Sequence, residues 1–172
     1  MLWMIACGGG IDGTGVIDSP AGSGSGKRDA AVDGGPMFAA AKAFCVSETN
    51  RYRAMNSKPA LTERAQLETY ADTGAMVDYT SNSPHSHFSS TQGGGIAFAE
   101  NECPGHSGWH LPPGGDMSML VGQCVAAFFS EGPGSDYNTH GHYINMMGNY
   151  GTLGCGIYQS GNDVTIIQDY GQ

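Results

Sequence analysis

The sequence has few basic residues, and they are absent from its longer part. Only seven of the 172 residues are Lys or Arg, the last of these is Arg64, and the formal net charge is −9. Residues 65–172 nevertheless contain ten Asp or Glu residues and all six histidines. A surface of this charge repels phosphate backbones and attracts cations, so we expect no nucleic-acid partner.

Long apolar runs and paired cysteines are also missing. No apolar run is long enough to cross a membrane. None of the five cysteines lies in a Cys-x-x-Cys pair, which argues against a structural zinc knuckle. We therefore expect a fold that does not need a metal in order to form.

The odd number of cysteines leaves one for another role, and Cys7 is the candidate. It follows the apolar residues 2–6 and precedes three glycines, so this segment resembles the end of a bacterial lipoprotein signal, where the cysteine is lipidated after cleavage. No basic residue precedes the apolar segment, and a complete signal would need more residues upstream. We expect membrane association only through a lipid at Cys7, and an extracytoplasmic location as a cell-envelope lipoprotein or a secreted protein.

Common catalytic motifs are missing as well. The sequence contains neither the His-Glu-x-x-His helix of zinc proteases nor the Gly-x-Ser-x-Gly elbow of serine hydrolases. Cys155 is the cysteine closest in sequence to the His142 segment, and in an oxidised protein it is not available as a nucleophile. We therefore expect a binding module rather than an enzyme.

The remaining sequence predicts one folded domain after a tether. Residues 8–36 are mainly Gly, Ser, Asp and Pro, which is typical of a flexible linker. Residues 37–172 contain the periodic apolar patterns of a single domain, which we expect to be monomeric.

Hydrophobic periodicity predicts helices first and strands last. The expected helices span residues 37–55, a segment capped by Thr62 with a buried stripe of Leu67, Tyr70, Ala71, Gly74 and Val77, and residues 116–131. The expected strands are 143–147, 153–159 and 164–169, after an irregular, functional segment at 80–115. This order predicts an α+β fold.

Several segments resemble the CAP superfamily, which contains cysteine-rich secretory proteins, antigen 5 and group-one pathogenesis-related proteins. They are Asn50-Arg51-Tyr52-Arg53 with Pro59-Ala60-Leu61, Ala99-Glu100-Asn101, Gly141-His142-Tyr143, Gly154-Cys155-Gly156 and residues 164–170. Ala99, Phe128, Asn145 and Gly148 depart from the usual family residues. The resemblance, closest to a bacterial subgroup, implies a three-layer α-β-α sandwich with a small antiparallel central sheet.

The resemblance also implies a cleft with two histidines and two glutamates. The matching positions are His85, Glu100, Glu131 and His142. His87 and Glu102 remain alternatives to the first two, because residues two apart in an extended segment lie on the same side. His140 is a further alternative, since a His-x-His pair on a strand can bind zinc from one face.

Such a constellation can bind a divalent cation, act as general acid and base, or form a structural network. We expect a cation, Zn or Ca/Mg, with a small apolar or peptide ligand. A metal-dependent hydrolase using the same four residues is the alternative.

Four cysteines remain after Cys7, and they allow three disulfide pairings. Cys103 and Cys124 flank the segment that enters the third helix, so we favour that bridge. Cys45 with Cys155 would then join the first helix to the sheet.

Overall fold

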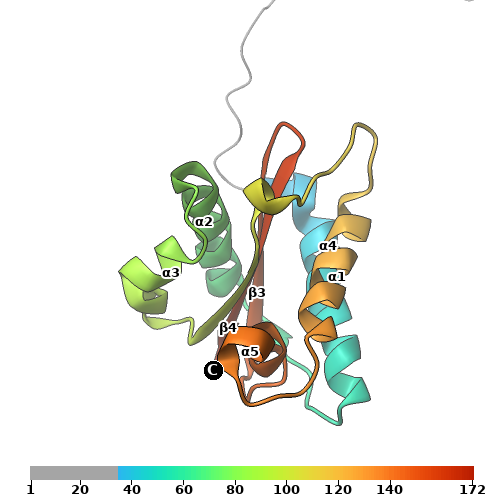
Figure 1. The fold of residues 1–172 in the computed structure, drawn as a ribbon, viewed down its shortest axis with the longest axis vertical. Coiled ribbons are helices and arrows are strands. Elements are labelled where there is room, and N and C mark those ends of the chain that lie inside the picture. The colour runs from blue at the N-terminus through green and yellow to red at the C-terminus, as the bar shows by residue number, and fades with distance from the viewer. Residues whose placement is uncertain (1–34) are drawn as a thin grey trace, which may run out of the picture.

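The computed structural model describes residues 35–172, which form a three-layer α+β sandwich (Figure 1). One layer contains α2 and α3, the middle layer is the sheet, and the other layer contains α1 and α4 (Figure 1). The elements are α1 (Gly35–Met55), β1 (Thr62–Glu63), α2 (Ala65–Ser81), α3 (Ser86–Thr91), η1 (Gln92–Gly95), β2 (Ala99–Cys103), η2 (Gly105–Ser107), α4 (Met117–Ser130), α5 (Tyr137–Met146), β3 (Thr152–Ser160) and β4 (Asp163–Gly171). The expected fold class is therefore confirmed.

The sheet has the strand order β1-β3-β4-β2. β3 and β4 form an antiparallel hairpin, β2 is antiparallel to β4, and the two-residue β1 adds a parallel edge to β3. The sheet is thus mixed, where a purely antiparallel one was expected. The register places Glu100 opposite Asp169 and Glu102 opposite Ile167, so these four side chains lie on the same face of the sheet.

The α2 layer lies very close to the sheet because both surfaces carry small residues. Ala71 and Ala75 on α2 are buried. A Cβ added to Gly154 or Gly156 on β3 would overlap the backbone of α2. This close approach brings α2 within reach of the acidic side chains of β2 and β4.

Two disulfides connect the layers and the core. Cys45 of α1 is bonded to Cys155 of β3, and Cys103 of β2 is bonded to Cys124 of α4. They are the two pairs that the sequence analysis favoured. All four cysteines are buried, together with apolar side chains of α4, β3 and β4.

Two predicted segments differ in the structure. Residues 143–147, expected as a strand, belong mostly to α5, because Asp136 caps this helix by accepting a hydrogen bond from the Asn138 amide. A five-residue apolar pattern does not separate helix from strand. The segment 80–115 is also more regular than expected, since it contains α3, β2 and two short 3₁₀ helices.

The other predicted elements agree closely with those observed. Helix α1 covers 37–55, and β3 and β4 cover the last two predicted strands. Thr62 lies in β1 instead of capping α2, which begins after Arg64. The predicted signal residues 1–7, Cys7 and most of the linker 8–36 lie outside the described residues. Among the described helices, none is long and apolar enough to cross a membrane.

Candidate functional site

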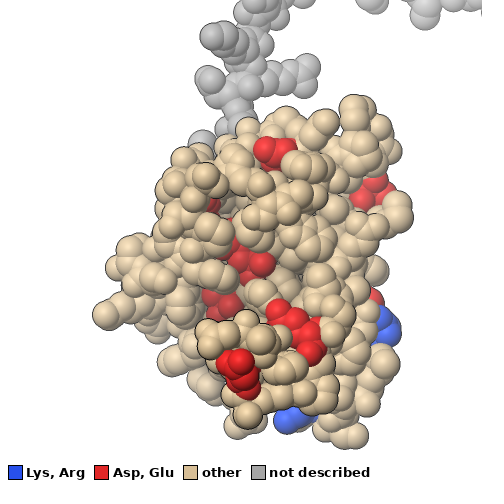
Figure 2. All heavy atoms as spheres, viewed as in Figure 1, with Lys and Arg blue, Asp and Glu red and all other residues tan. Residues whose placement is uncertain are grey.

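A cleft of about 400 Å³ opens between the α3 side of the molecule and α5. Figure 2 shows carboxylates gathered in the hollow of this face, with Lys and Arg only at its edge. The cleft is lined by His85, Phe88, Phe98, Ala99, Glu100, Glu131, Tyr137, Asn138, Gly141, His142 and Asn145. All four residues of the predicted constellation therefore reach one cavity, in two His–Glu pairs.

The first pair is His85 with Glu100. Nδ1 of His85 lies 2.8 Å from Oε1 of Glu100, which is carried by β2. His85 has a left-handed backbone conformation, with φ at 62°, directly before α3. This conformation is uncommon for a residue with a side chain, and neighbouring carboxylates hold it in place.

Two acidic residues fix the start of α3. The His85 amide donates a 2.7 Å hydrogen bond to Oε2 of Glu102. Asp78 of α2 accepts from the Ser86 hydroxyl and from the His87 amide with the same oxygen. Both acidic side chains are buried, and each leaves its second oxygen without a partner.

Burial and mutual repulsion alter the proton affinities of this cluster. Burial raises the pKa of the Glu102 carboxyl to about 7 and also raises the pKa of Glu100. The hydrogen bond with Glu100 raises the pKa of His85. Burial, together with the negative charges of Glu100 and Asp78, raises the pKa of Asp169 well above its usual value. The cluster therefore retains protons at pH values where exposed carboxyls have lost them.

The second pair is His142 with Glu131. Glu131 follows α4, and its Oε1 is hydrogen-bonded to Nδ1 of His142. Its Oε2 accepts from the amides of His142 and Tyr143 at 2.9 and 3.3 Å. The ring of His142 stacks on Phe128 with centroids 4.7 Å apart. Glu131 thus reaches the cavity from the end of α4.

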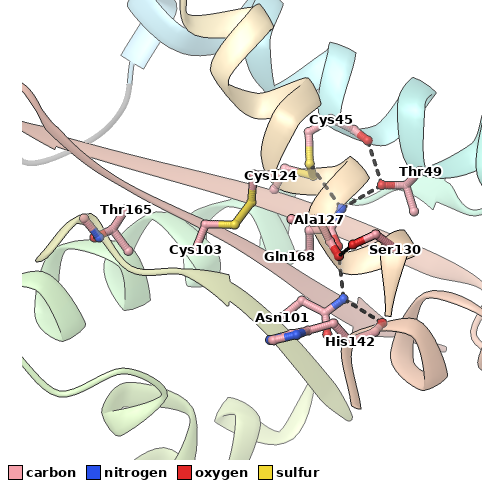
Figure 3. Close-up of a disulfide and its surroundings, with 12 residues drawn as sticks. Cys45, Thr49, Asn101, Cys103, Cys124, Ala127, Ser130, His142, Thr165 and Gln168 are labelled. Carbon is pink, nitrogen blue, oxygen red and sulfur yellow. Dashed lines mark hydrogen bonds between the residues drawn. A yellow bond between two sulfur atoms is a disulfide. The ribbon is translucent and has the colours of Figure 1, made fainter. Parts of the chain in front are cut away.

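A chain of buried amides fastens α5 to the sheet. Asn101 of β2 donates to the carbonyl of His142 and to Oε1 of Gln168. Gln168 in turn donates a hydrogen bond to the hydroxyl of Thr49, which lies near Cys45 on α1 (Figure 3). Asn145 donates to Oδ1 of Asn101. These contacts fix the position of α5, and with it His142, relative to β2.

Figure 3 also shows the disulfide between Cys103 and Cys124 close to this chain. Cys103 ends β2, the strand that carries Glu100 and Glu102, and Cys124 lies on α4, the helix that leads to Glu131. The disulfide therefore connects the elements that supply the carboxylates of both pairs.

The alternative histidines do not join the cleft. The ring of His87 packs against that of Tyr70 in a tilted arrangement, with centroids 4.7 Å apart, and His87 does not line the cavity. His140 directs Nδ1 to the carbonyls of Glu131 and Gly132, where it caps the end of α4. The expected His-x-His zinc grip on a strand is wrong, because His140 and His142 lie on a helix.

Glu102, in contrast, joins Glu100 instead of replacing it. One ligand atom from each of His85, Glu100 and Glu102 lies within 4.8 Å of the others, and no other group of three or more His, Cys, Asp or Glu residues comes this close among the described residues. Asp78 and Asp169, which also belong to this cluster, were not predicted from the sequence. Asp78 follows Gly74 by four residues on the buried stripe of α2, so helical spacing could have indicated it.

Comparison with known proteins gives one family and a similar fold. Residues 46–170 match the CAP family, described as the Cysteine-rich secretory protein family. The fold is similar to a crystal structure of NaASP2 with Zn²⁺, with a TM-score of 0.54 and 18% identity over 86% of this chain and 84% of that chain. No curated protein matches the sequence.

Proposed function

The chain belongs to the Cysteine-rich secretory protein (CAP) family, and from this premise we propose that its cleft binds a divalent cation. The observation that carries the proposal is that two His–Glu pairs face one cavity. A carboxylate that holds one ring nitrogen orients the imidazole and raises its basicity, as is common for metal-ligating histidines. The similar fold of NaASP2, determined with Zn²⁺, is consistent with such a role.

The cleft also has features that suit a small apolar or peptide ligand. Phe88, Phe98 and Tyr137 line it, and Phe98 and Tyr137 are 59% and 58% exposed. Aromatic side chains beside a few polar groups are typical of ligand pockets. We propose that the chain acts as a binding module in which the cation and the aromatic side chains contact the same ligand.

The cation proposal is tested by calorimetric titration of chelator-treated protein with ZnCl₂. Wild type should bind about one equivalent, and the variant with His85→Ala and His142→Ala together should lose binding. Equal binding by wild type and variant would exclude the cleft as the cation site. Circular dichroism of both proteins controls for folding.

The same samples separate binding from hydrolysis. The residues that line the cleft include no Ser, Thr, Cys or Lys, so hydrolysis would depend on a water activated by a bound cation or by the His and Glu side chains. Zn-loaded wild type should leave an unstructured test peptide intact. Cleavage that is lost in the double variant would favour a metal-dependent hydrolase instead.

We further propose that the protein is exported. Two buried disulfides persist best in an oxidising compartment, which supports this location. A lipid at Cys7 would attach the domain to a membrane, whereas without it the protein would be secreted. Labelling with a radioactive fatty acid should mark wild type and not the Cys7→Ser variant, and equal labelling of both would exclude Cys7 as the anchor.

A further inference from the structure

We propose that the protein has a second cation site, remote from the cleft, in which His106 and Asp163 bind a transition-metal ion such as Cu²⁺. The site lies where the segment after η2 runs beside the turn between β3 and β4 (Figure 1). Asp163 begins β4, and Asp169 of the cleft cluster is six residues further along this strand. At the rise of an extended strand, this separation corresponds to about 20 Å, so the site is independent of the cleft and of its proposed function.

Backbone contacts hold the loop between η2 and α4 against the start of β4. His110 of this loop forms an isolated antiparallel bridge with Asp163. Beside this bridge, the Val164 amide donates a 2.9 Å hydrogen bond to the carbonyl of Trp109. The histidines of the loop are therefore positioned next to Asp163 by the main chain and not only by their flexible side chains.

The orientation of His106 is fixed by its neighbours. The amide of Gly105, the preceding residue, donates a 3.0 Å hydrogen bond to the buried hydroxyl of Thr165. The His106 ring stacks on Tyr79 with centroids 4.1 Å apart, and its Nε2 lies 3.0 Å from the main-chain carbonyl oxygen of Tyr79. Because a carbonyl oxygen can only accept, Nε2 carries the ring proton, and Nδ1 of the neutral imidazole has a lone pair.

This second nitrogen of His106 lies close to a carboxylate. Its distance from Oδ2 of Asp163 is 3.9 Å. Two acceptors held this close repel each other unless a proton or a cation lies between them. Ligands that bind one Zn²⁺ at about 2.0–2.2 Å are separated by about 3–4 Å from one another. A metal ion between Nδ1 and Oδ2 could therefore contact both atoms.

The other contacts of Asp163 orient its carboxylate for such an ion. The Tyr79 hydroxyl donates a 3.0 Å hydrogen bond to Oδ2, and Nδ1 of His110 lies 2.8 Å from Oδ1. Hydrogen bonds of this kind orient the carboxylates that ligate metals. Within the described part of the chain, the ion pairs of Asp163 are with His106 and His110 only, and no Lys or Arg follows Arg64 in the sequence. No basic side chain therefore neutralises this carboxylate.

The donor set indicates an exposed site for an ion that prefers imidazole. The side chains of His106 and Asp163 are 40% and 30% exposed, so water can complete the coordination. Cu²⁺ binds such ligands more tightly than other divalent first-row metals, whereas Mg²⁺ prefers oxygen. We therefore use Cu²⁺ as the probe. Zn²⁺ should bind two ligands here more weakly than the His and Glu side chains of the cleft, and it should contribute little to the ZnCl₂ titration.

The experiment titrates the full chain with CuCl₂ after His85→Ala and His142→Ala have removed the cleft histidines. This double variant should bind about one equivalent of Cu²⁺, with nitrogen coupling from imidazole in its electron paramagnetic resonance spectrum. Adding His106→Ala or Asp163→Asn should weaken binding by at least about tenfold. Adding His87→Ala, which removes another partly buried imidazole outside the site, is the matched control and should leave binding unchanged.

Amide NMR spectra of wild type provide a second measurement, because bound Cu²⁺ broadens the signals of nearby residues. A small amount of Cu²⁺ should broaden residues 105–110 and 162–164, in addition to any effect at the cleft. Binding that does not change with Asp163→Asn would mean that Cu²⁺ contacts isolated imidazoles only, and would overturn the inference. So would a double variant that binds no Cu²⁺, because a proton alone would then separate His106 from Asp163. Neither result would affect the Zn²⁺ proposal for the cleft, which its own titration tests.

Discussion

Glu102 gives the metal-free protein a specific dependence on pH. Burial raises its pKa from 4.5 to about 7. Between these values the folded protein holds a proton that the unfolded chain has lost, so the free energy of unfolding decreases as the pH rises through this window. The shift corresponds to at most about 3 kcal/mol. The raised pKa values of His85, Glu100 and Asp169 act in the same direction.

This prediction is checked by urea unfolding at pH 5 and pH 8 in the presence of a chelator. Wild type should be less stable at pH 8 than at pH 5. Glu102→Gln should lose less stability between the two pH values, because a neutral amide replaces the titrating carboxyl while the other groups remain. An equal loss in both proteins would show that Glu102 does not titrate in this range.

Single residues could be predicted from the sequence where a motif or a helical face defines them. Glu131 continues the inward face of α4 and His142 lies in the Gly-His-Tyr segment, and both reach the cleft. The choice between Glu100 and Glu102 could not be made, because alternation along a strand places both on one face. Asp78 was missed although it continues the buried stripe of α2, because an acidic residue on such a stripe is usually expected to be exposed.

At the scale of elements, the close contact between α2 and β3 depends on Gly156. A Cβ at this position would overlap the backbone of Ala71, and neither a helix nor a central strand can move freely. Gly156→Ala should therefore lower the free energy of unfolding by about 2–4 kcal/mol. Urea unfolding measures this loss.

Gly151→Ala is the matched control for Gly156→Ala. At Gly151 the nearest neighbour of an added Cβ is a backbone carbon of Gln172 at 3.5 Å, an ordinary contact. This variant should stay within about 0.5 kcal/mol of wild type. Equal stability of the two variants would mean that α2 and β3 are not packed as closely as described.

Elements with a clear apolar pattern were predicted accurately from the sequence, whereas β2 was not. Helices α1 and α4 have long apolar stripes, and they were predicted nearly to the residue. Strand β2, with the sequence Ala-Glu-Asn-Glu-Cys, is buried on both faces although three of its five residues are polar. Its burial arises from tertiary partners such as Asn145, His85 and Asp78, which no local pattern contains.

At the scale of the whole molecule, the two disulfides constrain the unfolded chain to different extents. Cys45 and Cys155 are 110 residues apart, and Cys103 and Cys124 are 21 residues apart. The entropy that a crosslink removes from the unfolded chain grows with the logarithm of the enclosed loop. Loops of these lengths correspond to about 4–5 and about 3 kcal/mol in this description.

Replacing Cys45 and Cys155 together by Ser should therefore destabilise the protein more than replacing Cys103 and Cys124 together. The expected difference in the free energy of unfolding is about 1.5 kcal/mol, measured by urea unfolding of both double variants. All four cysteines are buried, so each pair of substitutions adds a similar cost for burying hydroxyl groups, and this cost largely cancels in the comparison. A larger loss for the shorter loop would mean that Cys103–Cys124 stabilises the folded cleft directly, through its link between β2 and α4.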